Sequence, residues 1–371
     1  MVSEPVWLGA RGVSKAANMR AVLLTGHGGY DRLEVRHDVP VPTPGRNDVL
    51  IRVGAAGVNN TDINTRIGWY SKAITEATDA TEAEAGTGIT GAEDDGWSGA
   101  PFQFPRIQGA DACGRIVAVG QNVDAMRIGA RVLVMPNLQG DSRYDIRYFG
   151  SEVDGGFADY ACVPAINAFC IESPLSDAEL ASFPCAYATA ENILTRMGLV
   201  AGERVLITGA SGGVGSAAVQ LAKRRGAEVI AMASGEKAEL VRALGAIQVV
   251  PRDADLQALF GEEHFDAAID VVGGVQFAAI LNTLKRGGRY GVSGAISGPI
   301  VDLDLRTLYL KDLRLIGCTV LEPEVFPNLI GYIERGEIKP LVAATYPLTE
   351  IVAAQEAFMT KRHVGKIVLT L

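Results

Sequence analysis

The chain has 371 residues, which exceeds what a single hydrophobic core usually organises, so we expect two domains. Hydrophobic residues make up 48% and charged residues 21% of it, as in ordinary globular proteins, and no apolar run is as long as a membrane-spanning helix. The net charge of −9 disfavours a nucleic-acid-binding surface. We therefore expect no nucleic-acid partner and no membrane partner.

The first residues, Met1 to Asn18, contain charges and glycine but no sustained apolar stretch. We interpret residues 1–18 as a flexible tail and not as a signal peptide or membrane anchor, which leaves the cytoplasm as the expected location. The five cysteines lack C-x-x-C spacing, so we expect neither disulfides nor a structural zinc lobe.

The part of the chain from Met19 to about residue 172 is rich in predicted strands. Alternating apolar residues predict a half-buried antiparallel strand over Asp48–Val53. A polar turn follows at residues 57–64, and its Asn59 and the nearby Tyr70 are candidate hydrogen-bond donors. More strands are expected within residues 107–120, 129–135 and 155–163.

Residues 71–100 form an acidic insertion, in which seven Asp and Glu residues against Lys72 alone give a local charge of 1 − 7 = −6. Its Thr, Ala and Gly content, with few apolar anchors such as Trp97, predicts a mobile loop more than a packed subdomain. Its attachment after Tyr70 leaves three roles open: a lid over a cleft, a subunit contact, or a plain surface excursion.

A strand, a tight turn and a helix are predicted in sequence around residue 210. The apolar run Val205–Ile207 ends in glycines, and a helical pattern continues from Ser216. Such a turn presents backbone N–H groups to a diphosphate. Glycine loops also occur as plain turns, but the flanking strand and helix favour a dinucleotide site. The candidate residues are Ala210, which replaces the usual first glycine, Ser211, Gly212, Gly213, Val214 and Gly215.

The next strand, Glu228–Ala233, ends where an NAD-specific protein would place an acid to hold the adenosine ribose. No Asp or Glu occupies the strand end itself. Ser234, Lys237 and Arg252 would suit a 2′-phosphate, so the predicted cofactor is NADPH. The alternative is that these three are ordinary surface residues at loop ends.

Strands and helices alternate after about residue 172. Helices are predicted over Lys237–Leu244 and Gln276–Leu284, and strands over Gln248–Val250, Phe265–Val272, Arg289–Val292 and Leu313–Gly317. This alternation predicts an α/β fold with a doubly wound parallel sheet.

Several segments together resemble the medium-chain dehydrogenase/reductase superfamily, in its zinc-free quinone oxidoreductase-like branch. The segments are Pro42–Thr61, Ile107–Gly120, Gly155–Pro164, Ala181–Leu194, Gly202–Leu221 and Arg362–Leu369. The resemblance implies a GroES-like β-barrel domain over residues 19–172 and 319–371, with a Rossmann nucleotide-binding domain over residues 173–318 inserted in it. It also implies cofactor contacts from Thr189, from the backbone near Val292 and from Lys366, and a homodimer paired through Leu313–Cys318.

Zinc-dependent members of this superfamily place a Cys, a His followed by Glu, and a second Cys around a catalytic metal. The matching positions here hold Asn59, Ala110 with Asp111, and Cys185. Zn²⁺ needs three good protein ligands, and an Asn amide is a poor one. We therefore predict no metal site, and interpret Cys185 as a small buried hydrophobe; the alternative is that it is a relic of a metal site.

Without zinc, a conjugated acceptor is the easier substrate, because the charge that develops on its oxygen needs only hydrogen-bond donors. Asn59 and Tyr70 are the candidate catalytic donors; alternatively, Asn59 only bonds its own turn and Tyr70 only packs. The predicted function is NADPH-dependent reduction of quinones or α,β-unsaturated carbonyls. The alternatives are an enoyl-thioester (acyl-CoA) reductase, a zinc-type alcohol dehydrogenase relative, and a non-enzymic NADPH-binding protein.

Overall fold

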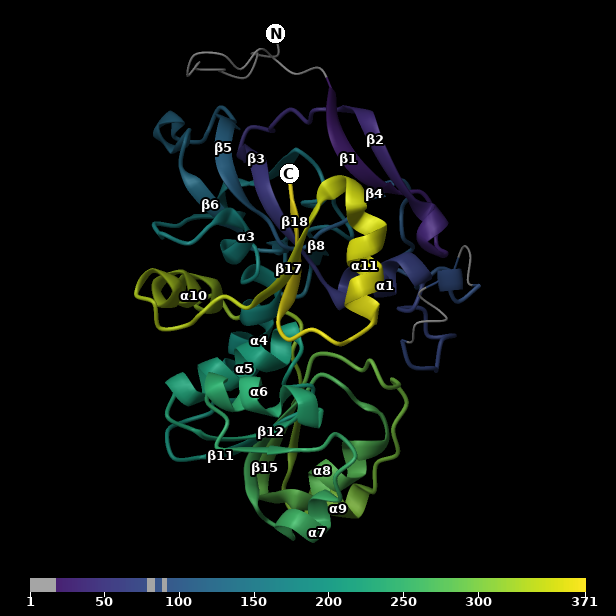
Figure 1. Cartoon of the computed structure of the whole chain (residues 1–371), viewed down its shortest axis with the longest axis vertical. Coiled ribbons are helices and arrows are strands. Elements are labelled where there is room, and N and C mark those ends of the chain that lie inside the picture. The colour runs from purple at the N-terminus through teal and green to yellow at the C-terminus, as the bar shows by residue number, and fades with distance from the viewer. Residues whose placement is uncertain (1–17, 79–83, 89–91) are drawn as a thin grey trace.

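A computed structural model describes residues 18–78, 84–88 and 92–371. The predicted tail therefore lies outside the described residues except for Asn18, where the first strand begins. Figure 1 shows two lobes stacked along the long axis, with the C-terminus and the start of the first strand in the same lobe. Within the described residues, no helix is long and apolar enough to cross a membrane.

The first lobe is built from strands that form a barrel-like core, and its strand pairs are antiparallel except for β17 with β18, which is parallel. One sheet has the order β2-β1-β4, and the larger has the order β10-β6-β5-β3-β18-β17 with β9 also on β3. The smaller sheet contains β1 (Asn18–Leu24), β2 (Leu33–Pro40) and β4 (Arg106–Ile107). The larger contains β3 (Asp48–Val58), β5 (Cys113–Val119), β6 (Arg131–Val134), β9 (Tyr160–Pro164), β10 (Ala168–Cys170), β17 (Val342–Pro347) and β18 (Lys366–Thr370).

The end of the chain returns to this first lobe. Strand β18 pairs antiparallel with β3, with Ile367 opposite Val58. This register places Lys366 beside the polar turn that begins at Asn59. Two short strands, β7 (Asn137–Gln139) and β8 (Ile146–Tyr148), form a separate hairpin. The helices of this lobe and its junction are α1 (Asn60–Ile67), α3 (Asp177–Leu180), α10 (Val325–Glu334) and α11 (Ile351–Met359).

The second lobe contains a six-stranded sheet of order β13-β12-β11-β14-β15-β16, in which every pair of neighbours is parallel. This order confirms the predicted doubly wound sheet. Its strands are β11 (Arg204–Ile207), β12 (Glu228–Met232), β13 (Gln248–Val250), β14 (Phe265–Asp270), β15 (Leu284–Val292) and β16 (Arg314–Gly317). Its helices are α4 (Pro184–Met197), α5 (Gly213–Arg224), α6 (Ala238–Leu244), α7 (Leu256–Phe260), α8 (Phe277–Thr283) and α9 (Leu305–Leu310).

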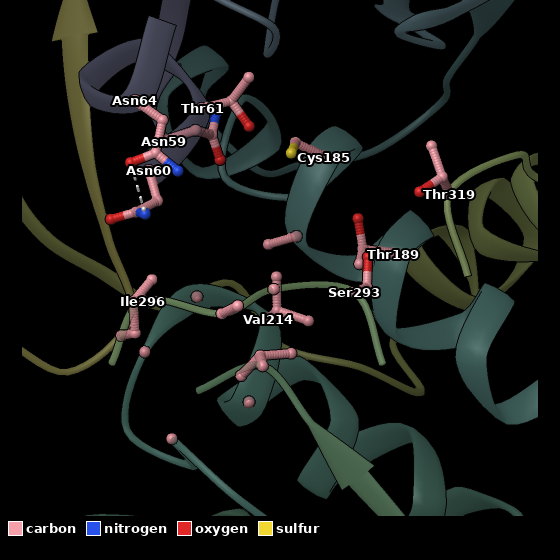
Figure 2. A pocket seen from close by; sticks show the side chains of 18 of the residues that line it. Asn59, Asn60, Thr61, Asn64, Cys185, Thr189, Val214, Ser293, Ile296 and Thr319 are labelled. Carbon is pink, nitrogen blue, oxygen red and sulfur yellow. Dashed lines mark hydrogen bonds between the residues drawn. The ribbon is translucent and has the colours of Figure 1, made fainter. Parts of the chain in front are cut away.

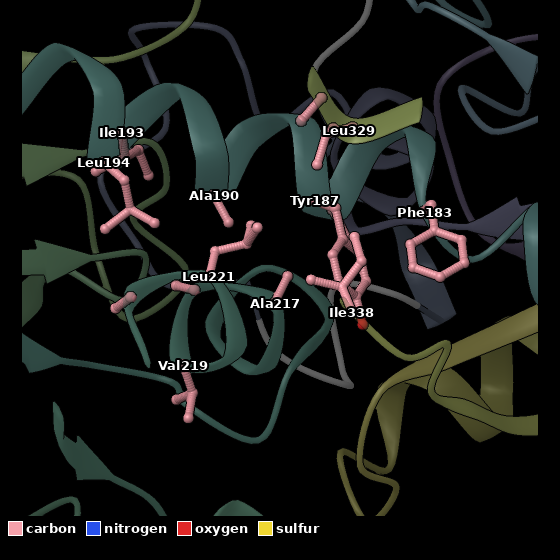
Figure 3. Packing of buried hydrophobic residues seen from close by; sticks show 14 of the residues in the cluster. Phe183, Tyr187, Ala190, Ile193, Leu194, Ala217, Val219, Leu221, Leu329 and Ile338 are labelled. Carbon is pink, nitrogen blue, oxygen red and sulfur yellow. The ribbon is translucent and has the colours of Figure 1, made fainter. Parts of the chain in front are cut away.

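Helices α4 and α5 pack closely against each other beside the glycine turn (Figure 3). Ala190 on α4 and Ala217 on α5 are fully buried small residues, which allow the two backbones to approach. Tyr187 and Gln220 add a buried hydrogen bond of 2.9 Å between the helices. The start of α5, where the glycine turn ends, is therefore supported by α4.

Candidate active site

The turn between β11 and α5 has the conformation that a dinucleotide-binding turn requires. Gly209 has a φ of +56°, a backbone conformation that residues other than glycine rarely adopt. A Cβ on Gly215 would lie 2.2 Å from the Gly209 carbonyl oxygen, so only glycine fits there. Gly212 forms the N-cap of α5, whose first amides have no acceptor within the helix. These amides are available to an anion.

A cavity of about 570 Å³ lies where the two lobes meet, and the glycine turn forms part of its wall. Figure 2 shows the polar group Asn59, Asn60, Thr61 and Asn64 across the cavity from Val214 and Ile296, with Cys185 on α4 nearer the polar group and Thr189 farther along α4 beside Ser293. The first group comes from the barrel lobe and the second from the carboxyl edge of the parallel sheet. Ligands of doubly wound folds bind at this edge.

The predicted cofactor residues divide into two sets in the structure. Those that line the cavity are Thr189, Gly212, Gly213, Val214, Gly215, Val292 and Lys366. Ala210 and Ser211 belong to the same turn, and the Ser211 carbonyl accepts a 3.1 Å hydrogen bond from Gly365 N. Ser234, Lys237 and Arg252 lie farther along the sheet edge, after β12 and β13.

Lys361 connects these two sets and was missed at the sequence level. It lines the cavity, and its Nζ lies 3.2 Å from Asn60 Oδ1 and 3.9 Å from the centroid of the Phe358 ring. Lys237 Nζ donates to the Lys361 carbonyl. Burial, followed by repulsion from Lys237, lowers the pKa of Lys361 to about 8. An ammonium whose charge is destabilised in this way is suited to binding an anion.

His363 is a second residue that sequence reasoning missed. It lines the cavity, and its buried Nδ1 has no hydrogen-bond partner among the described residues. Burial, followed by the charges of Lys361, Lys237 and Lys366, lowers the pKa of His363 to about 4. It is therefore a neutral imidazole at neutral pH, available to a ligand hydroxyl. His363 belongs to the closing segment of the superfamily resemblance and Lys361 directly precedes it, and their residue types were the only available signal.

A buried ion pair lies at the barrel side of the cavity. Lys366 Nζ is 2.8 Å from Asp111 Oδ2, donates to the Val58 carbonyl at 3.0 Å, and also donates to Asn59 Oδ1. The Asp111 carboxylate also accepts from Asn59 Nδ2 at 2.8 Å and from Cys185 N at 2.5 Å. All three ammonium hydrogens and both carboxylate oxygens therefore have partners inside the protein.

This arrangement does not fit a catalytic zinc ion. The positions that match the zinc ligands do meet in space, because Asp111 bonds both Asn59 and Cys185. The cation that Asp111 and Asn59 face, however, is the ammonium of Lys366. A zinc ion would meet an amide, an alanine and this positive charge, and only the Cys185 thiol is a good ligand. Among the described residues, no cluster of His, Cys, Asp and Glu could hold a metal ion.

The two predicted donors differ in their surroundings. Asn59 uses its amide hydrogens on the Gly57 carbonyl, at 3.3 Å, and on Asp111. Its side chain is therefore committed to positioning Asp111 and Lys366. Tyr70 lines the cavity, and burial raises the pKa of its phenol well above the usual value, while hydrogen bonds with Thr61 and Asn64 offset part of this shift. Tyr70 thus remains protonated at all physiological pH values.

Part of the cavity wall is aromatic. The Tyr148 hydroxyl lies 3.2 Å from Cys185 Sγ, and the Trp97 ring stacks on the Tyr148 ring with centroids 4.5 Å apart. Burial, followed by the charge of Asp111, raises the pKa of the Cys185 thiol to about 12. The thiol is therefore neutral and packs as an apolar group, as predicted from its residue type. No pattern in the sequence indicated that Trp97 and Tyr148 would meet.

Two family models match the chain. The alcohol dehydrogenase GroES-like domain matches residues 45–174, and the zinc-binding dehydrogenase model matches residues 213–335. The human quinone oxidoreductase is 30% identical to this chain over an alignment of 367 residues that covers 95% of this chain and 98% of that protein. The acryloyl-coenzyme A reductase of Metallosphaera sedula is also 30% identical, over 95% of this chain and 100% of that protein.

The fold has a close counterpart among solved structures. A Sinorhizobium meliloti 1021 protein, provisionally named an alcohol dehydrogenase, superposes with a TM-score of 0.84 at 45% identity, covering 97% of this chain and 98% of that chain. Together with the GroES-like match, this similarity confirms the predicted combination of a GroES-like barrel and a Rossmann sheet.

Proposed function

Because the chain belongs to the medium-chain dehydrogenase/reductase superfamily, we propose that it is an NADPH-dependent oxidoreductase that reduces quinones or α,β-unsaturated carbonyl compounds without zinc. The observation that carries this proposal is the Lys366–Asp111 ion pair, in which the ammonium of Lys366 faces Asp111 and Asn59, two of the residues at the positions that match the zinc site. Lacking a metal to polarise a simple carbonyl, the site favours an acceptor whose conjugation already spreads the developing charge.

The residues along the sheet edge fit NADPH. The first-turn amides of α5 and the turn Gly212–Gly215 would hold the diphosphate. Lys237, Arg252 and Lys361 supply positive charge for the 2′-phosphate, and Ser234 supplies a hydroxyl. Thr189 and the backbone near Val292 would orient the nicotinamide, which when bound provides the hydride.

Tyr70 is the proposed hydrogen-bond donor to the acceptor oxygen, because it is a protonated phenol at the cavity wall. Asn59 supports it indirectly by fixing the Lys366 ammonium, whose charge lies close to the cavity and favours negative charge on a bound acceptor. Preorganised donors and charges of this kind are stronger where less water surrounds them, and the Trp97 and Tyr148 rings make part of the cavity wall apolar.

A second candidate acceptor class is an enoyl thioester, because a relative of equal identity is named as an acryloyl-coenzyme A reductase. Both candidates are tested by one assay of NADPH oxidation against quinones, enones, acryloyl-coenzyme A and saturated aldehydes. Turnover of a quinone or enone above the thioester supports the proposal. Turnover restricted to acryloyl-coenzyme A would assign the second class, and turnover of the saturated aldehydes alone would refute both.

A further inference from the structure

The acidic insertion packs against the body of the protein at several points. Asp95 Oδ2 lies 3.0 Å from His27 Nε2, and both side chains are almost fully buried, at 4% and 3% exposure. His27 Nδ1 is bound at 2.8 Å to the carbonyl of Thr65, and its ring lies against Phe104. The other oxygen of Asp95 accepts from Phe102 N at 2.7 Å. The insertion is thus fastened to the barrel at Asp95, two residues before Trp97.

A second set of bonds sets the position of Trp97 relative to Tyr148. The Glu152 carboxylate accepts from Ser98 N at 3.0 Å with one oxygen and from Tyr148 N at 2.9 Å with the other. One side chain therefore ties the backbone of the insertion to the backbone of β8. The resulting stack of Trp97 on Tyr148 is nearly parallel, with an interplanar angle of 25°.

The same insertion reaches the nucleotide-binding lobe. Thr78 N donates to the Ile296 carbonyl at 3.0 Å, and the Thr78 hydroxyl donates to Asn64 Oδ1 at 3.1 Å. Ile296 and Asn64 both line the cavity, on opposite sides in Figure 2. The described parts of the insertion therefore connect residues of both lobes that line the cavity, and they supply Trp97 to its wall.

The size of the cavity limits how large an acceptor can fit beside Trp97. Its volume of about 570 Å³ is typical of a pocket for one drug-sized ligand, and part of it must hold the nicotinamide end of the cofactor. Trp97 and Tyr148 both line the cavity, and their stacked rings form part of its wall. A planar, compact acceptor can stack on this wall, whereas an acceptor with additional fused rings would overlap the Trp97 side chain.

We infer that Trp97 is a specificity-determining residue that restricts the acceptor to compact, single-ring or short-chain unsaturated carbonyl compounds. Asp95 is the positioning residue that holds it in place. This inference rests on the proposed function for the identity of the acceptor class. It assigns to the acidic insertion the role of a fixed wall.

The test compares a one-ring acceptor, tetramethyl-1,4-benzoquinone, with a three-ring acceptor, 9,10-phenanthrenequinone. Trp97→Ala should shift the ratio of kcat/KM at least tenfold toward the three-ring quinone. Trp97→Phe, which keeps an aromatic ring, should shift it less than threefold, as should Glu93→Ala, an exposed substitution in the same insertion. Asp95→Asn leaves the Trp97 ring intact and should shift the ratio in the direction of Trp97→Ala.

The dissociation constants of the two quinones from the NADP⁺ complex give a second ratio, measured on the same variants. No hydride is available in this complex, so the second ratio reports binding alone. This readout separates the inference from the proposed function. Wild-type protein that reduces neither quinone, yet shows the Trp97-dependent binding ratio, would contradict only the proposed function. A change of less than threefold in both ratios for Trp97→Ala, or an equal change in Glu93→Ala, would overturn the inference.

Discussion

Lys366 Nζ and Asp111 Oδ2 lie 2.8 Å apart, and their side chains are only 4% and 0% exposed. The lysine comes from the last strand and the aspartate from the segment before β5, so the pair closes the chain end onto the barrel. It also places the Lys366 ammonium against Asp111 and Asn59, two residues at the positions that match the zinc site of the superfamily.

Breaking this pair should be costly. Lys366→Met and Asp111→Asn should each lower the free energy of unfolding by about 3–5 kcal/mol, because the remaining charge is buried without its partner. The double variant should lose less than the sum of the two, as measured by urea denaturation in a double-mutant cycle. Lys285→Met, at a more exposed pair with Asp266, should cost less than about 1 kcal/mol. Strict additivity of the two buried substitutions would contradict the account.

Lys361 should destabilise the folded protein when no cofactor is bound, and it should favour binding of the cofactor. Its pKa of about 8 lies below the usual 10.5, so between these values the unfolded chain binds a proton that the folded chain has lost. The free energy of unfolding should therefore rise with pH through this window. Lys361→Met should stabilise the apo protein at pH 7 by about 1–3 kcal/mol, since loss of the Asn60 contact offsets part of the gain.

The affinity for NADPH should change in the opposite direction. Above about pH 8, binding an anion beside Lys361 requires protonation first, so the Kd should increase with pH in the wild type. Lys361→Arg, which stays charged, should flatten this dependence, and Lys361→Met should weaken NADPH binding at pH 7. Titration calorimetry across pH 7–9 measures both effects. A pH-independent Kd in the wild type would exclude Lys361 from the cofactor site.

Substitution of the two sequence-predicted donors should separate chemistry from positioning. Tyr70→Phe should lower kcat about ten- to a thousandfold and leave NADPH affinity nearly unchanged. Asn59→Ala should lower kcat within the same range and also lower the Tm, because Lys366 and Asp111 each lose a partner. Tyr144→Phe, at a residue that is 73% exposed, is the matched control. Wild-type turnover in both Tyr70→Phe and Asn59→Ala would remove both residues from the mechanism.

Strand β16 is an edge strand of the parallel sheet, and exposed apolar side chains gather in and near it. These are Leu305, Tyr309, Leu310 and Leu315, which are 64%, 62%, 56% and 39% exposed. We expect a homodimer paired through this edge, and Leu315→Lys should yield monomers in sedimentation velocity. Met126→Lys, at a 90% exposed position in the barrel lobe, should leave the dimer intact. A wild-type monomer at micromolar concentration would contradict the expectation.

The elements that sequence patterns predicted are those whose signals are local. The strand, glycine turn and helix around residue 210 follow from neighbouring residues, and the structure places most of the candidate turn residues at the cavity. The Lys366–Asp111–Asn59 cluster depends instead on the pairing of β18 with β3, which joins residues about 300 positions apart. The Trp97–Tyr148 stack requires the insertion to fold back through Asp95 and Glu152, and no periodicity encodes such contacts.

The central claim is that this chain passes a hydride from NADPH to a conjugated acceptor with no metal ion in the site. The direct measurement is the rate of NADPH oxidation with a quinone by protein dialysed against a chelator, with metal content determined on the same sample and NADH tested in parallel. We expect an undiminished rate, substoichiometric zinc before dialysis, and NADPH binding at least tenfold tighter than NADH binding, which is a difference of about 1.4 kcal/mol in binding free energy. Stoichiometric zinc whose removal abolishes turnover would contradict it.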